Sequence, residues 1–236
     1  MIEKMKYKIA VIVPAYNEEN TIANVVNGVR ALGEGYDPIV INDDSRDRTF
    51  SIAQQEGAII IDLACNLGIG GAVQTGFRYA TLNNYDACVQ LDGDGQHPTE
   101  EIPYLIKTLF GEDLDIVIGS RFIEKTGYDI SFMRRIGIRI IGLFLKIFTG
   151  MSIKDSTSGF RAINAKAAGF FAHNYPQDFP EPESLIFVHK YGFKFKEVPV
   201  EMKNRLHGTS SITPIKAVYY MIKVLLAMFI DLFKKL

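Results

Sequence analysis

The first half of the chain alternates short apolar segments with segments of helical periodicity, and this order restricts the fold more than any other feature. The apolar segments have the length of buried strands and lie at residues 9–14, 38–41, 58–63, 87–91 and 116–119. Apolar residues recur with helical spacing between them, at residues 18–32, 47–56, 70–82 and 99–109. Strands that alternate with helices form mostly parallel sheets with helices on both faces. We therefore expect an α/β fold of this kind.

Polar residues stand directly after several of these expected strands. Asn17 follows the first strand, Asp43 the second, and the pair Asp92 and Asp94 the fourth. Ligands of open, mostly parallel sheets bind outside the carboxyl ends of the strands. The positions of these polar residues therefore predict a ligand site at that edge of the sheet.

The pair Asp92 and Asp94 lies in the segment DGDGQHP, residues 92–98. In an extended segment both carboxylates point to the same side, where their charges repel each other. The glycines between and after them leave room for a ligand near the backbone. Such carboxylates suit a hard divalent cation, Mg2+ or Mn2+, which can carry a diphosphate on its remaining positions. Taken alone, the short motif is also compatible with a solvated Asp-Gly turn.

The composition is that of a folded protein and gives no support to nucleic-acid binding. Of 236 residues, 47% are hydrophobic and 22% charged, which separates the chain from disordered sequences, and its net charge is −1. The length suffices for one substantial core. Cys65 and Cys88 have neither metal-site spacing nor the number of a disulfide framework, so we expect buried, reduced thiols.

Two segments in the second half combine apolar and basic residues. The first, residues 131–149, contains Arg134, Arg135, Arg139 and Lys146 among mostly apolar side chains. This pattern indicates a helix in the membrane interface, with its basic residues toward lipid phosphates. A core helix between the sheet and the C-terminal region is the alternative.

The second segment, residues 214–236, is apolar and interrupted by Lys223 and Asp231. Its apolar stretch, residues 217–230, is shorter than the ~20 residues that a membrane span needs, so we expect a peripheral anchor.

The expected organisation is an α/β domain at residues 1–212, which includes the helix at 131–149, and a membrane-associating helix at 213–236. The N-terminal residues 1–8 are charged and do not form a signal peptide. We therefore expect the protein at the cytoplasmic face of the cell membrane. The sequence does not specify the oligomeric state, and a homo-oligomer is compatible with it.

Further motifs accompany the aspartate pair in a fixed order. They are VIVPAYNEE at 11–19, INDDSRDRT at 41–49, NLGIGGA at 66–72, GSRF at 119–122, DSTSGFRA at 155–162 and RLHGTSS at 205–211. With the segment at 92–98, they resemble the motifs of family-2 glycosyltransferases over nearly the whole chain, closest to the branch that acts on dolichyl or polyprenyl phosphate. Asp44 departs from the pattern, because glycine is usual there, but aspartate tolerates a positive φ better than most residues.

The resemblance implies a Rossmann-like GT-A fold and a metal-dependent, inverting transfer of a sugar from UDP or GDP to a polyprenyl phosphate. It implies that Asp92 and Asp94 bind Mg2+ or Mn2+, and that Arg205 neutralises the leaving diphosphate. Nucleotide contacts are implied for Pro14, Ala15, Tyr16, Glu18, Asn42, Asp43, Asn66, Gly70, Asp92 and Gly93. Contacts to the donor sugar or acceptor are implied for Gln96, Ser120, Arg121, Ser158, Gly159 and Arg161.

Two of these assignments leave alternatives open. Arg161 is suited to hold an anionic acceptor, and equally to pair with Asp155 as a structural support. Glu183, in the segment PEPE at 180–183, is grouped with Asp94 and Arg205 as a catalytic residue. It is suited to act as a general base, to contact the metal or sugar, or to cap a helix that begins at Ser184.

Three other functions share parts of this sequence pattern. A transferase acting on a sugar hydroxyl of a cell-surface polysaccharide would use Glu183 as its base, whereas a phosphate acceptor is already ionised and needs none. A nucleotidyltransferase would carry a Gly-rich, basic loop after the first strand, where this chain has Pro14–Asn17. A catalytically silent scaffold would have no need of Asp92, Asp94 and Arg205 together.

Overall fold

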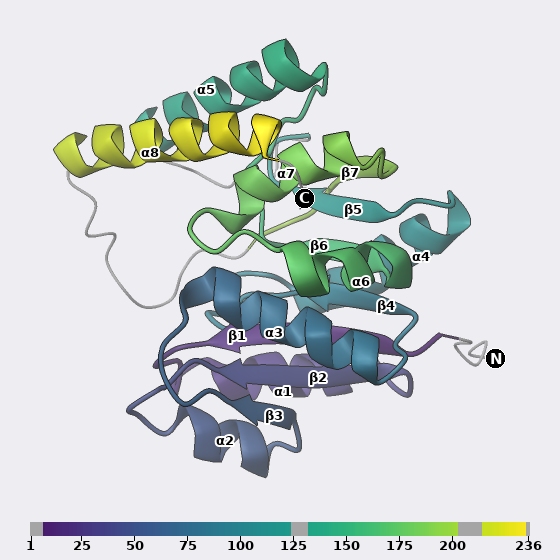
Figure 1. Ribbon diagram of the computed structural model, residues 1–236. Helices are drawn as coiled ribbons and strands as arrows, with labels where there is room; N and C mark the ends of the chain where they lie inside the picture. Colours follow the sequence, from purple (N-terminus) through teal and green to yellow (C-terminus); the bar gives the residue numbers. More distant parts are fainter. Residues whose placement is uncertain (1–6, 124–131, 203–213, 235–236) are drawn as a thin grey trace.

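The protein forms one seven-stranded sheet covered by helices on both faces (Figure 1). The computed structural model describes residues 7–123, 132–202 and 214–234. The strand order is β3-β2-β1-β4-β6-β5-β7. Only β6 among these strands runs antiparallel to its neighbours, β4 and β5. The strands are β1 Ile9–Ala15, β2 Tyr36–Asn42, β3 Ile59–Asp62, β4 Ala87–Gln90, β5 Ile116–Ser120, β6 Arg161–Asn164 and β7 Phe195–Pro199. The expectation of a mostly parallel α/β sheet is confirmed.

Alternate residues of the central strand enter two separate hydrophobic cores, as the two-residue period of a strand requires. Ala10 and Ile12 pack on the side of α3 and α6, whereas Val11 and Val13 pack on the side of α1 and α4. The helices of the described chain are α1 Ile22–Arg30, α2 Thr49–Gln55, α3 Gly68–Leu82, α4 Ile102–Gly111, α5 Phe132–Thr149, α6 Ala165–Asn174, α7 Pro180–Lys190 and α8 Pro214–Phe233; a short 3-10 turn, Thr99–Glu101, precedes α4.

The two basic and apolar segments form helices α5 and α8, which lie side by side beyond the β5–β7 end of the sheet (Figure 1). Both also contact α7. On α5, Ile141 and Leu145 are buried in the core, while Leu143 and Ile147 are exposed. The helix is therefore partly a core helix, as the alternative interpretation had it. No helix in the described ranges is long and apolar enough to cross a membrane.

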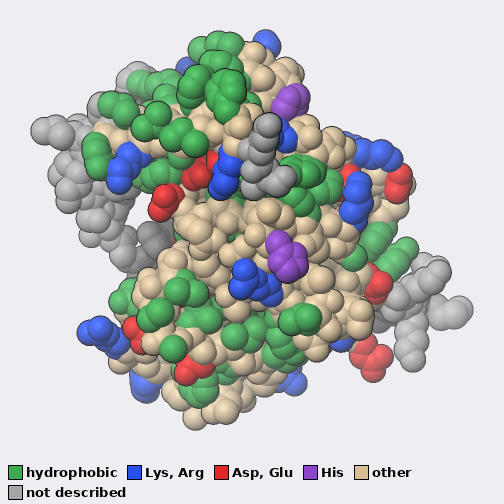
Figure 2. Space-filling view, viewed as in Figure 1, with side chains coloured by type: hydrophobic (Ala, Val, Ile, Leu, Met, Phe, Trp, Pro, Cys, Tyr) green, Lys and Arg blue, Asp and Glu red, His purple; other side chains and the backbone are tan. Residues whose placement is uncertain are grey.

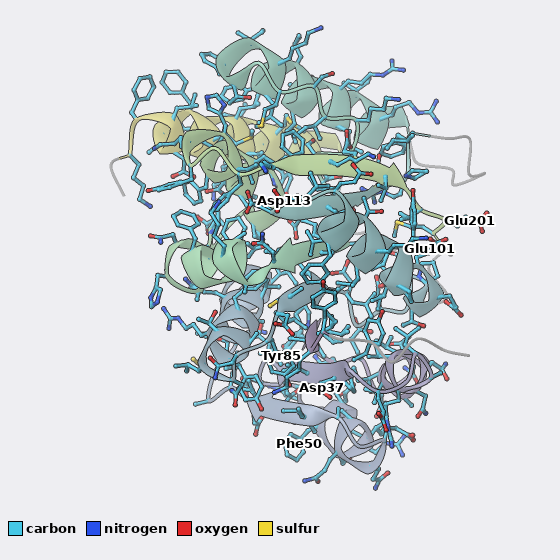
Figure 3. All side chains as sticks on the ribbon, turned by 90° about the vertical axis from the view of Figure 1, so that its right-hand side faces the viewer. Asp37, Phe50, Tyr85, Glu101, Asp113 and Glu201 are labelled. Carbon is cyan, nitrogen blue, oxygen red and sulfur yellow. The ribbon has the colours of Figure 1, made fainter. Side chains whose placement is uncertain are left out.

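The two ends of the strands differ in character. At the amino ends, the Tyr85 hydroxyl donates to Asp37 Oδ2 at 2.8 Å and ties β4 to β2 (Figure 3). The carboxyl ends carry the polar loops examined below. Cys88 is buried in β4 as expected, but Cys65 is exposed. The expectation for Cys65 is wrong because this residue lies in the surface loop between β3 and α3.

Candidate active site

A pocket of about 300 Å3 opens at the carboxyl ends of β1, β2 and β4. It is lined by Pro14, Ala15, Tyr16, Glu18, Asp43, Ile69, Ala72, Asp92, Gly93, Asp94 and Glu181. The parallel register places Ala15 beside Asn42, so the loops after β1 and β2 leave the sheet at the same level. The structure thus brings together residues that are up to 167 positions apart in the sequence, from Pro14 to Glu181.

Asp43 organises the floor of this pocket. It is buried, and its two carboxylate oxygens accept the backbone N–H groups of Leu67 at 2.7 Å and Gly68 at 3.0 Å. The Asn66 amide donates to the Asp43 carbonyl at 3.0 Å. Asp44 adopts a φ of 59°, a value at which glycine is usual and aspartate is tolerated. The loop after β2 and the start of α3 therefore form one hydrogen-bonded unit.

The loop that carries Asp92 and Asp94 is held just as closely. A Cβ atom on Gly93 would lie 3.0 Å from the Pro14 carbonyl, so this position needs glycine. The Thr21 hydroxyl donates to the Gly93 carbonyl at 2.8 Å. Asp94 Oδ1 accepts the backbone N–H of Gln96 at 3.0 Å and shapes the turn. Both aspartates reach the pocket from this supported loop.

His97 lies beneath the same loop. Its side chain is buried and stacks on Phe160, with ring centroids 5.1 Å apart and an interplanar angle of 14°. Nδ1 accepts the backbone N–H of Asp92 at 3.3 Å. Burial lowers the pKa of His97 to about 4, so the imidazole is neutral at pH 7.

The pocket lining is strongly acidic. Its carboxylates come from Glu18, Asp43, Asp92, Asp94 and Glu181, and no Lys or Arg side chain lines it in the described part of the chain. Burial raises the pKa of Glu181, and Arg161 and Asp92 act on it in opposite directions. A diphosphate would be repelled from such a lining unless a cation neutralised it.

The donor set fits a hard divalent cation. Within the described residues no three His, Cys, Asp or Glu side chains converge into a complete metal site. Mg2+ and related cations are commonly held by one or two carboxylates, with phosphate oxygens and water completing the coordination. Asp92 and Asp94, which line one pocket from one loop, match that arrangement.

Several residues assigned to the donor sugar or acceptor are structural supports in this fold. Arg121 is buried and pairs with Asp155, with both nitrogen–oxygen distances at 2.7 Å. Of the two alternatives left open for Arg161, the pairing with Asp155 is therefore wrong. Arg161 is also buried and donates to the Ser158 carbonyl, the Glu181 carbonyl and the Ser184 hydroxyl at 2.7–2.8 Å. These bonds fasten the start of α7 to β6.

The remaining predicted residues lie behind the pocket lining. The Asn42 amide donates to Asp62 at 2.7 Å and links β2 to β3. The Ser158 hydroxyl donates to the Gly119 carbonyl at 2.6 Å. Outside the lining as well are Asn66, Gly70, Gln96, Ser120 and Gly159. Arg205 lies outside the described residues, so its assignment stays a prediction.

Glu183 lies outside the lining of this pocket, so the structure does not bring it together with Asp92 and Asp94. Helix α7 begins at Pro180, before the expected start at Ser184, so Glu181 and Glu183 project to different sides of a helix. Glu181 lines the pocket with Asp92 and Asp94. Glu183 instead accepts the Phe179 N–H at 2.8 Å and borders a second cavity with Asp231 of α8.

The sequence interpretation also missed apolar residues of the lining. Ile69 and Ala72 are three positions apart on the first turn of α3 and both reach the pocket. Their i, i+3 spacing within the NLGIGGA motif could have indicated that both side chains lie on the same face of the helix.

Comparison with known protein families assigns the chain to one of them. Residues 10–169 match the family described as glycosyl transferase family 2. The chain belongs to glycosyltransferase family 2. The enzyme class and the GT-A-like α/β architecture expected from the sequence are thereby confirmed.

Relatives of this family-2 glycosyltransferase include enzymes named for lipid-phosphate acceptors. The UDP-N-acetylglucosamine–dolichyl-phosphate N-acetylglucosaminyltransferase of Methanococcus voltae is 27% identical over 98% of this chain and 100% of its own length. The dolichol-phosphate mannosyltransferase of Pyrococcus furiosus is 32% identical over 87% of this chain and 59% of its own. Glucosyl-3-phosphoglycerate synthase from Mycobacterium tuberculosis, solved with Mn2+ and UDP, superposes with a TM-score of 0.72 at 18% identity, covering 98% of this chain and 81% of its own. That likeness shows the fold.

Proposed function

We propose that this glycosyltransferase moves a sugar from a nucleoside diphosphate, UDP or GDP, to a polyprenyl phosphate, with Mg2+ or Mn2+ and with inversion at the anomeric carbon. The observation that carries the proposal is the acidic pocket at the strand ends, where Asp92 and Asp94 face the same space as Asp43. Relatives named for dolichyl phosphate support the choice of acceptor.

The diphosphate binds beside Asp92 and Asp94. A bound cation would neutralise the diphosphate and lower the energy of the charge that develops as it leaves. Gly93 allows the close approach of the loop to the Pro14 carbonyl and so keeps both carboxylates at the pocket wall. Arg205 is the second group that we assign to the leaving diphosphate.

The nucleoside occupies the side of the pocket formed by Tyr16, Asp43 and Ile69. Tyr16 and Ile69 are exposed, at 47% and 39%, and offer apolar surface to a base. Asp43 is held by backbone N–H groups, and each carboxylate oxygen retains capacity to accept a further hydrogen bond from the base or ribose.

The acceptor approaches the donor sugar from the side of Glu181. A phosphate oxygen needs no general base, and burial that favours the neutral form of Glu181 reduces its repulsion of an anionic acceptor. The position of Glu181 in the pocket also supports a second candidate function. A sugar hydroxyl of a polysaccharide would require a base, and Glu181 is placed to serve as one.

Helices α5 and α8 supply the surface that we assign to the membrane. Their exposed apolar side chains are Ile140, Leu143, Ile147, Phe148, Tyr219, Tyr220, Ile222, Leu226, Phe229, Ile230 and Phe233. Figure 2 shows hydrophobic side chains gathered over these helices. The charged side chains exposed on them in the described range are all basic: Arg135, Arg139, Lys146 and Lys223. An apolar surface with a basic margin suits the interface of a membrane with anionic lipids, here its cytoplasmic face.

Titration calorimetry with UDP and GDP, each with and without Mn2+, tests the pocket. We expect one nucleotide to bind, and to bind only with the cation. If neither UDP nor GDP binds, with or without Mn2+, the proposal is contradicted.

A further inference from the structure

His97 is a buried polar side chain directly behind the proposed metal loop. It is 5% exposed, and its Nδ1 accepts the backbone N–H of Asp92 at 3.3 Å. The same nitrogen lies 3.7 Å from Asp92 Oδ2. A leucine of similar size would fill the space, but it would leave the Asp92 N–H without this acceptor.

The ring of His97 is fixed from the other side by the segment that precedes β6. Phe160 is fully buried and stacks on the imidazole. Its neighbour Gly159 approaches Asp92 itself, because a Cβ atom at Gly159 would lie 3.3 Å from Asp92 Oδ1. Ser158 and Arg161 anchor this segment to Gly119 and α7. The segment 158–161, in which Ser158, Gly159 and Arg161 were expected to contact the donor sugar or acceptor, thus supports the loop at 92–97.

We propose that His97 is a positioning residue, whose Nδ1 holds the Asp92 backbone so that the Asp92 carboxylate faces the cation and diphosphate. The inference rests on the proposed function, because it concerns the same metal site. The hydrogen bond to Nδ1 fixes the peptide plane before Asp92 and therefore the direction of its side chain. The stack on Phe160 keeps the imidazole in the orientation in which Nδ1 serves as the acceptor.

Two substitutions separate the hydrogen bond from the packing. In H97F the stacked ring remains and the acceptor is lost, whereas H97N keeps an acceptor and loses the ring. Mn2+ binding is measured by electron paramagnetic resonance with UDP and, in parallel, with GDP, and folding by thermal melting. F160L removes the stacking partner and reports what packing alone contributes.

We expect H97F to melt cooperatively and to bind Mn2+ about tenfold more weakly than wild type, the effect of one lost hydrogen bond, with H97N within about threefold. F160L should lower the melting temperature more than H97F does, and should weaken Mn2+ binding less than H97F does. Unchanged Mn2+ affinity in folded H97F would overturn the role of His97 and leave the proposed function standing. If H97F does not fold, H97L replaces it with the same criterion. A wild-type protein that binds no Mn2+ with either nucleotide would instead overturn the metal site itself.

Discussion

Glu181 and Glu183 lie two positions apart on α7 but border different cavities, Glu181 the acidic pocket and Glu183 the space against α8. Because both are glutamates on the same helix, a variant of Glu183 is a matched control for a variant of Glu181. Arg161 holds the turn between them through the Glu181 carbonyl and the Ser184 hydroxyl. Differences between variants at the two positions report on the pocket and not on the general effect of losing a carboxylate from α7.

We expect E181Q to lower kcat by less than about tenfold on a polyprenyl-phosphate acceptor, because a general base, worth about 10²–10⁴-fold, is not needed there. E183Q should leave kcat at pH 7 close to that of wild type. Rates at saturating donor decide the comparison. A loss of 100-fold or more in E181Q, in the range assigned to a base, would contradict the expectation that the phosphate acceptor needs no base. An equal loss in both variants would contradict the separation of the two sites.

The contribution of Glu183 to the stability of the fold should decrease as the pH rises from 4.5 toward 8. Burial and the facing carboxyl of Asp231 raise the pKa of Glu183 from 4.5 to about 8. The folded protein then keeps a proton that the unfolded chain releases, so the stabilisation is complete below pH 4.5 and is lost as the pH passes through the folded-state value. In urea unfolding across this range, the difference in unfolding free energy between wild type and E183Q should change in favour of E183Q as the pH rises, because only wild type loses the Glu183 contribution. E34Q, which changes an exposed glutamate, should keep the wild-type slope.

A side chain at Gly159 should displace Asp92, because an added Cβ would lie 3.3 Å from Asp92 Oδ1 and 3.2 Å from the Gln90 amide nitrogen. We expect G159A to reduce Mn2+-dependent nucleotide affinity by about tenfold, the cost of roughly 1.4 kcal/mol in positioning the carboxylate. Gly169 on α6 has nothing within 4 Å of the corresponding position, so G169A is the control. Equal nucleotide affinities in the two variants would argue against close support of Asp92 by residue 159.

The surface of α5 and α8 should bind lipid vesicles. Ile147 is 67% exposed and Leu226 55% exposed, and charges at both positions would oppose insertion of the apolar surface. We expect the double variant I147E/L226E to lose most of its cosedimentation with vesicles that contain phosphatidylglycerol. Leu82 is 80% exposed at the end of α3, so L82E serves as the control. Undiminished cosedimentation of the double variant would exclude this surface as the membrane contact.

The sequence predicted the parallel part of the fold because buried parallel strands appear as short apolar runs, as in β1 and β4. It did not predict β6, a four-residue strand that begins with Arg161 and runs antiparallel between β4 and β5. The start of α7 was missed because PEPE resembles a loop, although proline is accepted in the first turn of a helix.

The sequence predicted the site residues that follow strand ends. It did not predict those whose position depends on where a helix begins or on a hydrogen-bond partner far away in the sequence. Asp43, Asp92 and Asp94 follow strands, and their convergence follows from parallel topology. To assign Glu181 rather than Glu183 to the pocket, one has to know that α7 begins at Pro180, because this start fixes the direction of each side chain. The pairing of Asp155 with Arg121 required two loops that are 34 residues apart to meet in three dimensions.

In the mechanism that we propose, Asp94 and a divalent cation support sugar transfer to a lipid phosphate. Purified protein is incubated with Mg2+ or Mn2+, a panel of UDP- and GDP-sugars and polyprenyl phosphate, and the lipid is analysed by mass spectrometry. We predict a glycosylated lipid phosphate from one donor, abolished by a chelator and reduced by at least about 100-fold in D94N, because removing groups that stabilise developing charge typically costs about 10²–10³-fold. D113N, which changes an exposed aspartate outside the pocket lining (labelled in Figure 3), should match wild type. A product that forms equally with the chelator or in D94N would contradict the account.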